Sequence, residues 1–390
     1  MRLLNFLTLV TLAACGSTPK FSRRTTEDAP ALQALRAAKF DDASRLASSQ
    51  LELDPRDSEA AAIRALASYV TASSAMLASL DVRHSWFPIL NALKPAQRPA
   101  VAAFLDRLGA VEKDLAIVAD DAHFSLELCL ACWRYDWNQD GAIDDSDTSL
   151  LTLETFLETD PRSKPTFRFD VGDVAWARAM ISFQRAAGEL FLSYRWTDAN
   201  LNSGEQQPVT IHLLAPERVE HALTLILAGL AFSDTAREEY LAETDDDREW
   251  VPNPHQTNHP IPMDVDERTY QTWAAVVREI RQLVTSKKGV SMREAVETFP
   301  KKNDFLAITP DSYLDLGRML SEPTDIVLAK NESGNDRESV TRFLRGLLGH
   351  GYSEHMSASG LTHRLAAMKG DLESSGDALE RKLRYLFWIN

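Results

Sequence analysis

Cysteine is scarce in this chain of 390 residues, which has only three, with a single CxxC pair among them. A structural zinc site is therefore not expected, because such sites use four ligands and no second CxxC exists. Glycine and proline, at 16 and 17 residues, are too few for a collagen-like or low-complexity chain. Basic residues are outnumbered by acids, 42 to 57, which leaves a net charge of −15. No nucleic-acid partner is expected, because binding the phosphates requires a basic stripe.

The remaining composition is that of a soluble globular protein, with 44% hydrophobic and 25% charged residues. The length is sufficient for two or three domains of ordinary size. The excess of acids fits either a solvated acidic surface or a protein that binds a cation.

The first residues form a targeting signal. Arg2 supplies one positive charge, and residues 3–12 form an apolar stretch that is too short to span roughly 30 Å of hydrocarbon as a helix. The Leu-Ala-Ala-Cys sequence at 12–15 resembles the lipobox of bacterial lipoproteins. The resemblance implies that signal peptide 1–14 is removed and that Cys15 carries a diacylglycerol, usually with a third acyl chain, which anchors the protein stably to a membrane. The alternative is an ordinary secretory signal that happens to contain a cysteine.

The residue after the lipobox bears on which membrane is used. In enterobacterial lipoproteins, Asp at this position retains the protein in the inner membrane, whereas this chain has Gly16. The resemblance therefore favours the outer membrane, and the periplasmic and surface faces both stay open. Residues 15–30 are polar and lack apolar periodicity, so we expect a tether there. The chain as a whole resembles lipoproteins of predatory and gliding bacteria such as myxobacteria.

Cys129 and Cys132 are an even pair in a compartment that oxidises thiols. Their motif, Cys-Leu-Ala-Cys-Trp, is not a haem attachment site, because Trp133 stands where His is required. A redox-active CxxC pair is expected next to a βαβ unit, and the surrounding sequence pattern does not predict one. The expected state is either a local disulfide or two buried thiols.

Helical periodicity dominates the rest of the chain and predicts an all-α fold, an irregular helical bundle. The predicted domains are helical hairpins at 31–119, a calcium domain at 120–200 and a C-terminal helical domain at 201–390. A short strand at 209–214 is a weaker prediction because it lacks an evident partner. The spacing predicts helices at 31–39, 41–53, 58–80, 99–118, 122–134, 150–158, 174–196, 216–231, 235–241, 267–284, 292–296, 313–319, 339–348, 360–368 and 377–388.

The first two predicted helices resemble one tetratricopeptide repeat. In that family an aromatic residue packs at the turn, a small residue lets the helices approach and a proline ends the second helix. Here these are Phe40, Ala43 and Pro55. One repeat cannot bury its own face. We therefore expect either a hairpin packed on the next helices or part of a peptide-binding array.

Residues 136–147 form the motif that carries chemistry, because their oxygen-bearing side chains alternate around a central glycine. The pattern resembles the calcium loop of the EF-hand, with Gly141 at the sharp turn, Ile143 as the apolar pin and helices expected on both sides. The resemblance implies one calcium ion held by side chains at five positions and by the backbone carbonyl of Ala142. The side-chain ligands are Asp136, Asn138, Asp140, Asp144 and Asp147.

The last ligand position departs from most EF-hands, which have Glu where this loop has Asp147. Dockerin-type loops tolerate Asp there, and a site of about 10⁻⁴ to 10⁻³ M would still be filled outside the cytoplasm. EF-hands usually pair, and residues 169–173 match the end of the loop. They are either an empty partner loop, with Phe169 beside Ile143, or a helix N-cap at Asp173.

Other polar groups give weaker signals. His255 and His259 have the four-residue spacing of a helical zinc pair, but Pro254 and Pro260 forbid a helix there. We expect an exposed loop, and a solvated acidic run at 245–247.

The sequence has no nucleophile elbow and no glycine-rich phosphate loop. We therefore expect no enzymatic activity. The predicted function is that of a binding or scaffold protein that holds an envelope partner, with calcium serving stability. The alternative is an envelope hydrolase that uses the loops at 243–262 or 349–360.

Overall fold

A computed structural model describes residues 29–80, 97–143, 147, 164–196, 209–246, 248–259, 265–285, 288–291, 294, 313–328, 352–353, 356–361 and 364. Within these residues the fold is all-α, which confirms the predicted class. The helices are α1 Pro30–Arg36, α2 Phe40–Leu53, α3 Ser58–Leu80, α5 Arg98–Ala119, α7 Val171–Ser193, α8 Pro216–Ala242, α9 Glu267–Val284 and α11 Leu316–Ser321.

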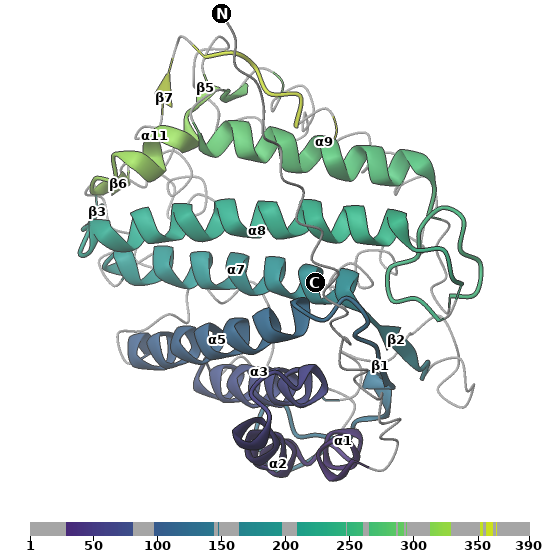
Figure 1. The fold of residues 1–390 in the computed structure, drawn as a ribbon. Coiled ribbons are helices and arrows are strands. Elements are labelled where there is room, and N and C mark those ends of the chain that lie inside the picture. Colours follow the sequence, from purple (N-terminus) through teal and green to yellow (C-terminus); the bar gives the residue numbers. More distant parts are fainter. Residues whose placement is uncertain are drawn as a thin grey trace, which may run out of the picture.

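The long helices lie in successive layers. α3 packs on α5, α5 on α7, α7 on α8 and α8 on α9, so that the chain climbs from the α1–α2 hairpin at one end to α9 at the other (Figure 1). The most extensive contact is between α7 and α8, where a Cβ on Gly229 would lie 2.6 Å from the ring of Phe183. A larger residue at Gly229 would therefore push these two helices apart.

Strands are short and join distant segments. β1 Leu126–Leu128 pairs antiparallel with β2 Phe167–Phe169, and β3 Val209–Ile211 pairs with β6 Ile326–Leu328. The third sheet has the order β4-β5-β7, from Val290–Ser291, Tyr313–Leu314 and Tyr352–Ser353. The weak strand prediction at 209–214 thus has a partner more than 100 residues away, which no local pattern could reveal.

The hairpin of α1 and α2 packs on α3. This agrees with the first of the two predicted alternatives, a hairpin packed on the next helices. Phe40 and Ala43 are both buried. The ring of Phe40 meets Trp133 edge-on at 5.1 Å and Tyr135 at 4.9 Å. These contacts tie the hairpin to the segment that leads into the predicted calcium loop. α3 is long and apolar enough, by length and composition alone, to cross a membrane, and here it packs against α2 and α5.

The helix predicted at 122–134 is wrong. This segment is β1 followed by a 3-10 turn at Leu130–Cys132. Phe124, Leu126 and Leu128 are buried while the residues between them are half-buried, so the true period is two and not 3.6. A dense run of apolar residues hid this alternation.

Two further helix predictions are corrected. Residues 216–231 and 235–241 belong to one helix, α8, and the segment at 313–319 begins as β5 before α11. The predicted helices at 150–158, 339–348 and 377–388 lie outside the described residues, as does most of 292–296 and 360–368. Residues 1–28, with the signal peptide and Cys15, also lie outside them.

Candidate functional site

The predicted calcium loop begins in an extended segment with aromatic anchors. Trp133 is buried, Tyr135 and Trp137 are half-buried, and the last two meet edge-on at 5.6 Å. Successive residues of an extended chain point in opposite directions, so these three rings, two residues apart, share one side and Asp136 points to the other. The Gln139 amide also donates to the buried Ser74 hydroxyl of α3 at 3.0 Å. The loop is therefore fixed to the helical core.

The first half of the loop folds around its own acidic side chains. The Asp136 carboxylate accepts from the backbone N–H of Asp140 at 3.1 Å and of Gly141 at 2.8 Å. Asn138 Oδ1 accepts from Asp140 N at 2.9 Å, and Asp140 Oδ1 from Ala142 N at 2.9 Å. Positive φ angles at Gln139 (56°) and Gly141 (91°) turn the backbone so that these N–H groups face inward.

Asp147 closes the loop. It is only 3% exposed, and its Oδ1 accepts from the backbone N–H of Trp137 at 2.8 Å. The first and last thirds of the loop are thereby held together across ten residues. Asp144 lies outside the described residues, and Ala142 is exposed with its N–H turned inward.

This arrangement is suited to a hard cation. The side-chain oxygens of Asp136, Asn138 and Asp140 are held by backbone donors and each keeps further lone pairs. An all-oxygen donor set delivered by one tight turn is what Ca²⁺ prefers. The residues present therefore fit the group that the sequence motif implies.

Two features of an ordinary EF-hand are missing. The loop is preceded by the turn at Leu130–Cys132 and not by a helix, and Ile143 is 44% exposed where it should pin the loop to a partner. The hypothesis of a second loop at 169–173 is wrong, because Phe169 pairs with Leu126 in the β1–β2 ladder. The alternative prediction, a helix N-cap at Asp173, is three residues too late. The N-cap of α7 is Asp170, and Asp173 completes its capping box.

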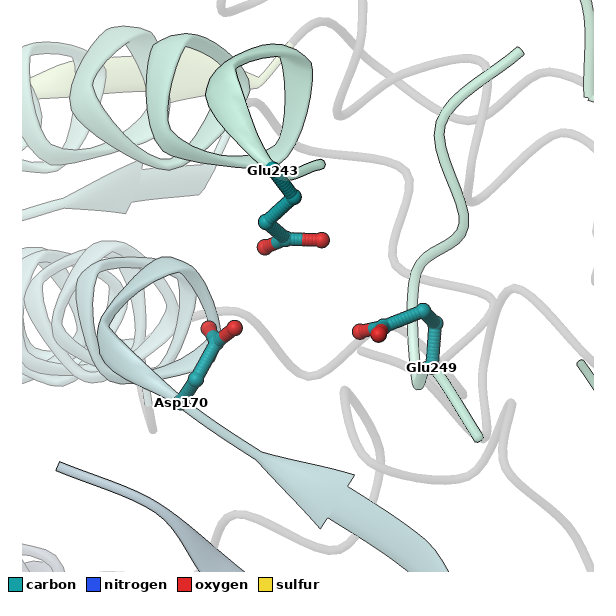
Figure 2. A group of neighbouring side chains, drawn as sticks. All are labelled: Asp170, Glu243 and Glu249. Atoms are coloured by element: carbon teal, nitrogen blue, oxygen red, sulfur yellow. The ribbon is translucent and has the colours of Figure 1, made fainter. Parts of the chain in front are cut away.

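A second acidic centre joins residues far apart in sequence. Within the described part of the chain, Asp170, Glu243 and Glu249 form the one group of three acidic side chains with oxygens within 4.8 Å of one another. Asp170 caps the start of α7, Glu243 caps the end of α8 and Glu249 lies in the loop after it. Figure 2 shows the three carboxylates pointing toward one another. We call this group the acidic triad.

Burial and like charges set the protonation of the triad. Desolvation, reinforced by Asp170, raises the pKa of Glu243 to about 10. One oxygen of Glu243 accepts from the Gln256 amide at 3.1 Å, and the other is buried without a hydrogen-bond partner. Glu249 is only 3% exposed. The group therefore holds a proton at neutral pH, or it exchanges that proton for a cation.

Behind the triad lies a buried pair. The Tyr240 hydroxyl donates to Asp173 Oδ1 at 2.8 Å, and burial raises the pKa of both groups well above their ordinary values. Asp173 also accepts from the backbone N–H of Asp170 at 3.0 Å. The triad and this pair together join α7 to α8 at one end of the helical stack.

The other predicted polar groups stabilise the loop after α8. His255 is exposed and lies 3.9 Å from Glu267, and among the described residues neither His255 nor His259 belongs to a group of three metal-ligating side chains. Asp245 pairs with Arg168 at 3.0 Å, and Asp246 accepts from residues 257 and 258, which lowers the pKa of Asp246. These acids fasten the loop to itself and to β2.

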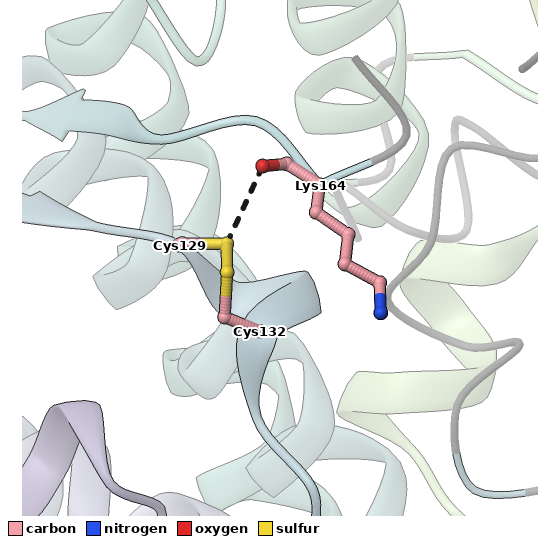
Figure 3. Close-up of a disulfide and its surroundings, with 3 residues drawn as sticks. All are labelled: Cys129, Cys132 and Lys164. Atoms are coloured by element: carbon pink, nitrogen blue, oxygen red, sulfur yellow. Dashed lines mark hydrogen bonds between the residues drawn. A yellow bond between two sulfur atoms is a disulfide. The ribbon is translucent and has the colours of Figure 1, made fainter. Parts of the chain in front are cut away.

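Cys129 and Cys132 form a disulfide, with their Cα atoms 5.3 Å apart. This is one of the two states that the sequence left open. The disulfide closes the turn that follows β1, and Figure 3 shows it beside Lys164, which precedes β2. Cys129 Sγ lies 3.5 Å from the carbonyl oxygen of Lys164.

Sequence reasoning located the loop but missed the triad. The loop lies within twelve consecutive residues, whereas the triad is assembled from residues 170, 243 and 249. The sequence did contain one signal for the triad, because acidic residues lie both at the predicted start of α7 and at the predicted end of α8. Comparison with protein families, with curated proteins and with solved structures finds no match to this chain.

Proposed function

We propose that this chain is a calcium-binding lipoprotein, anchored to the outer membrane through acylated Cys15, that acts as a binding or scaffold protein at the cell envelope. Calcium has a structural role in this proposal. The ion clamps residues 136–147 and stabilises the segments on either side, because metal binding free energy adds to folding free energy when the site forms only in the folded chain.

The observation that carries the calcium proposal is the set of hydrogen bonds inside the loop. Side chains at the first, third and fifth positions already accept backbone N–H bonds of 2.8 to 3.1 Å. Asp147, at the twelfth position, is held by the Trp137 N–H. The acidic groups are therefore positioned before an ion arrives, which reduces the ordering that binding requires.

The membrane proposal depends on the lipobox. Two or three acyl chains on Cys15 give stable anchoring, and the polar residues to 30 form a tether that leads into α1. The scaffold role is supported by the layered helices, which offer long side-by-side surfaces to an envelope protein (Figure 1). No nucleic acid is expected as partner because the net charge is −15.

Calorimetric titration of the full chain with CaCl₂ tests the calcium proposal. We expect one site with a dissociation constant of about 10⁻⁴ to 10⁻³ M. Asp136→Asn should abolish its heat, whereas Asp106→Asn, an exposed acid on α5, should leave it unchanged. Glu243→Gln should also leave it unchanged, which distinguishes the loop from the triad. Heat that survives in Asp136→Asn would contradict the assignment.

Cell fractionation tests the anchor. We expect the protein in the outer-membrane fraction, labelled by a fatty-acid probe, and we expect Cys15→Ser to lose both the label and the membrane location. A Cys15→Ser protein that remains in the membrane would contradict the proposal.

The alternative function is an envelope hydrolase with a site in the 243–262 or 349–360 loops. The observation that favours it is Glu243, since a carboxyl group kept protonated at neutral pH can act as a general acid. Chromogenic ester and glycoside substrates test this alternative. Turnover that Glu243→Gln abolishes and Glu239→Gln retains would establish Glu243 as the general acid of this activity, and equal rates in both variants would exclude that role.

A further inference from the structure

The disulfide of Cys129 and Cys132 faces solvent although the chain around it is anchored in the core. Ala131, between the two cysteines, is buried, and so is Trp133, whose ring contacts Phe40. The sulfur-bearing residues lie on the other side of this turn: Cys132 is exposed and Cys129 is half-buried. The bond therefore lies at the surface of a turn whose other side is fixed in the core.

A pocket opens beside the sulfur atoms. It has a volume of about 280 Å³ and is lined by Arg36, Glu127, Cys129, Cys132 and Thr166. This volume is close to the lower limit of about 300 Å³ for small-molecule pockets, so it admits a short peptide segment and not a large cofactor. A thiol that enters the pocket meets the disulfide directly.

The charge in the pocket is positive. Arg248 pairs with the Glu127 carboxylate, which neutralises the one acid in the lining. Arg36 donates to the backbone carbonyl of Glu127 at 3.2 Å, and no carboxylate among the described residues forms an ion pair with it. A guanidinium beside a sulfur atom favours the thiolate, which is both the attacking and the leaving form in disulfide exchange.

The bond is poorly placed to act as a structural staple. It encloses only two residues, Leu130 and Ala131, so it removes little chain entropy from the unfolded state. Structural disulfides resist reduction, whereas exposed ones are the labile, regulatory or catalytic ones. The pair does not lie in a βαβ unit. The features that indicate a redox role are therefore the exposure of the disulfide and the pocket beside it.

We propose that Cys129 and Cys132 form a thiol–disulfide exchange site that oxidises the dithiol of a cysteine-containing peptide. The first peptide thiolate attacks Sγ of Cys132, an exposed residue that lines the pocket. A mixed disulfide forms, the bond between the two protein sulfurs breaks, and Cys129 leaves as a thiolate with the electron pair.

The second step completes the exchange. The other thiolate of the same peptide attacks the peptide sulfur of the mixed disulfide, forms the peptide disulfide and releases the Cys132 thiolate. Two electrons pass from the peptide to the protein, and the two protons lost by the peptide thiols are taken up from water by the protein thiolates. The reduced Cys129 thiol can then donate to the Lys164 carbonyl oxygen, which lies 3.5 Å from Sγ.

Mass spectrometry after acid quenching and alkylation tests the proposal. The oxidised full chain, with Cys15→Ser so that the pair provides the only cysteines, is mixed at pH 7 with a reduced two-cysteine peptide. A synthetic oxidised peptide of residues 124–135 is the reference. We expect one peptide disulfide per chain, formed at least tenfold faster than with the reference. A rate equal to or below the reference would overturn the proposal.

Variants separate the parts of the site. Cys129→Ser should trap an activated peptide disulfide at Cys132 several-fold faster than Cys132→Ser traps it at Cys129. Arg36→Gln should slow peptide oxidation about threefold to tenfold, and Arg45→Gln, on α2 and paired with Asp42, should leave the rate unchanged. Equal trapping by the two cysteine variants, or peptide oxidation by a chain with both cysteines replaced by alanine, would overturn the assignment.

Discussion

In the loop at 136–147, acidic oxygens face backbone N–H groups, whereas in the acidic triad three carboxylates face one another. The loop therefore orders its charges before any ion arrives, and the triad depends on a proton or a cation to relieve repulsion. Both clusters contain several acids, so the number of acids does not determine whether a cluster is ordered without an ion. The hydrogen-bond donors around the carboxylates determine it.

The largest expected effect is at the closing residue of the loop. Asp147→Ala should lower stability by about 3 kcal/mol in 10 mM CaCl₂, because the calcium contribution is lost and the Trp137 N–H loses its partner. Thermal unfolding with Asp106→Ala as control measures it. A loss that is the same in calcium and in chelator would show that Asp147 acts without an ion.

A smaller loss is expected behind the triad. Tyr240→Phe should cost about 1 to 3 kcal/mol, because Asp173 is buried and loses its hydroxyl donor. Tyr270→Phe, which removes a hydrogen bond to the Pro252 carbonyl, should cost about 1 kcal/mol. Urea unfolding measures both. Unlike the loop variant, Tyr240→Phe should lose the same stability with and without calcium.

Glycine substitutions sharpen the comparison further. Gly141→Ala should cost about 1 to 2 kcal/mol and weaken calcium binding, because its φ is +91° although nothing lies within 4 Å of the added Cβ. Gly109→Ala lies within α5, where the new Cβ would make ordinary contact with Arg185, and it should stabilise by about 0.5 to 1 kcal/mol. Opposite signs in urea unfolding are expected, and a neutral Gly141→Ala would contradict the turn geometry.

The smallest effect concerns the pH dependence of the triad. The pKa of Glu243 is about 10 in the folded chain and near 4.3 when unfolded, so the folded state binds more protons between these values. Stability from this group is therefore present at low pH and declines as pH rises toward 10. Glu243→Gln should flatten that decline and make the chain more stable than the wild type at pH 9.

Urea unfolding at pH 5, 7 and 9 measures the slope, with Glu239→Gln on the exposed face of α8 as the control. A Glu243→Gln variant that keeps the wild-type slope would show that the triad ionises as ordinary surface acids do.

Local patterns predicted what is local in this fold. The helix at 267–284 has the predicted bounds, because its apolar spacing and the Asp266 cap lie within one segment. The loop at 136–147 was predicted for the same reason. The triad could not be predicted from local patterns, because its three residues come together only when β2, α7 and α8 have packed.

The errors at α8 and β1 have specific causes. Ser233 and Asp234 lie in the gap between the two predicted helices, but α8 continues through them because α9 satisfies both: Trp273 donates to Ser233 at 2.8 Å and Arg281 pairs with Asp234 at 2.8 Å. At β1 the strand pairs with residues about 40 positions later, so its extended form depends on a partner that the local run of apolar residues does not reveal.

Thermal unfolding of the full chain in 10 mM CaCl₂ and in excess chelator addresses the role of the loop most directly. For a site of about 10⁻⁴ to 10⁻³ M, we predict that calcium stabilises the fold by about 1.4 to 2.7 kcal/mol and raises the midpoint by about 2 to 3 °C. Asp136→Asn should remove this difference. An unchanged wild-type midpoint, or an equal shift in Asp136→Asn, would contradict a structural calcium ion in the loop.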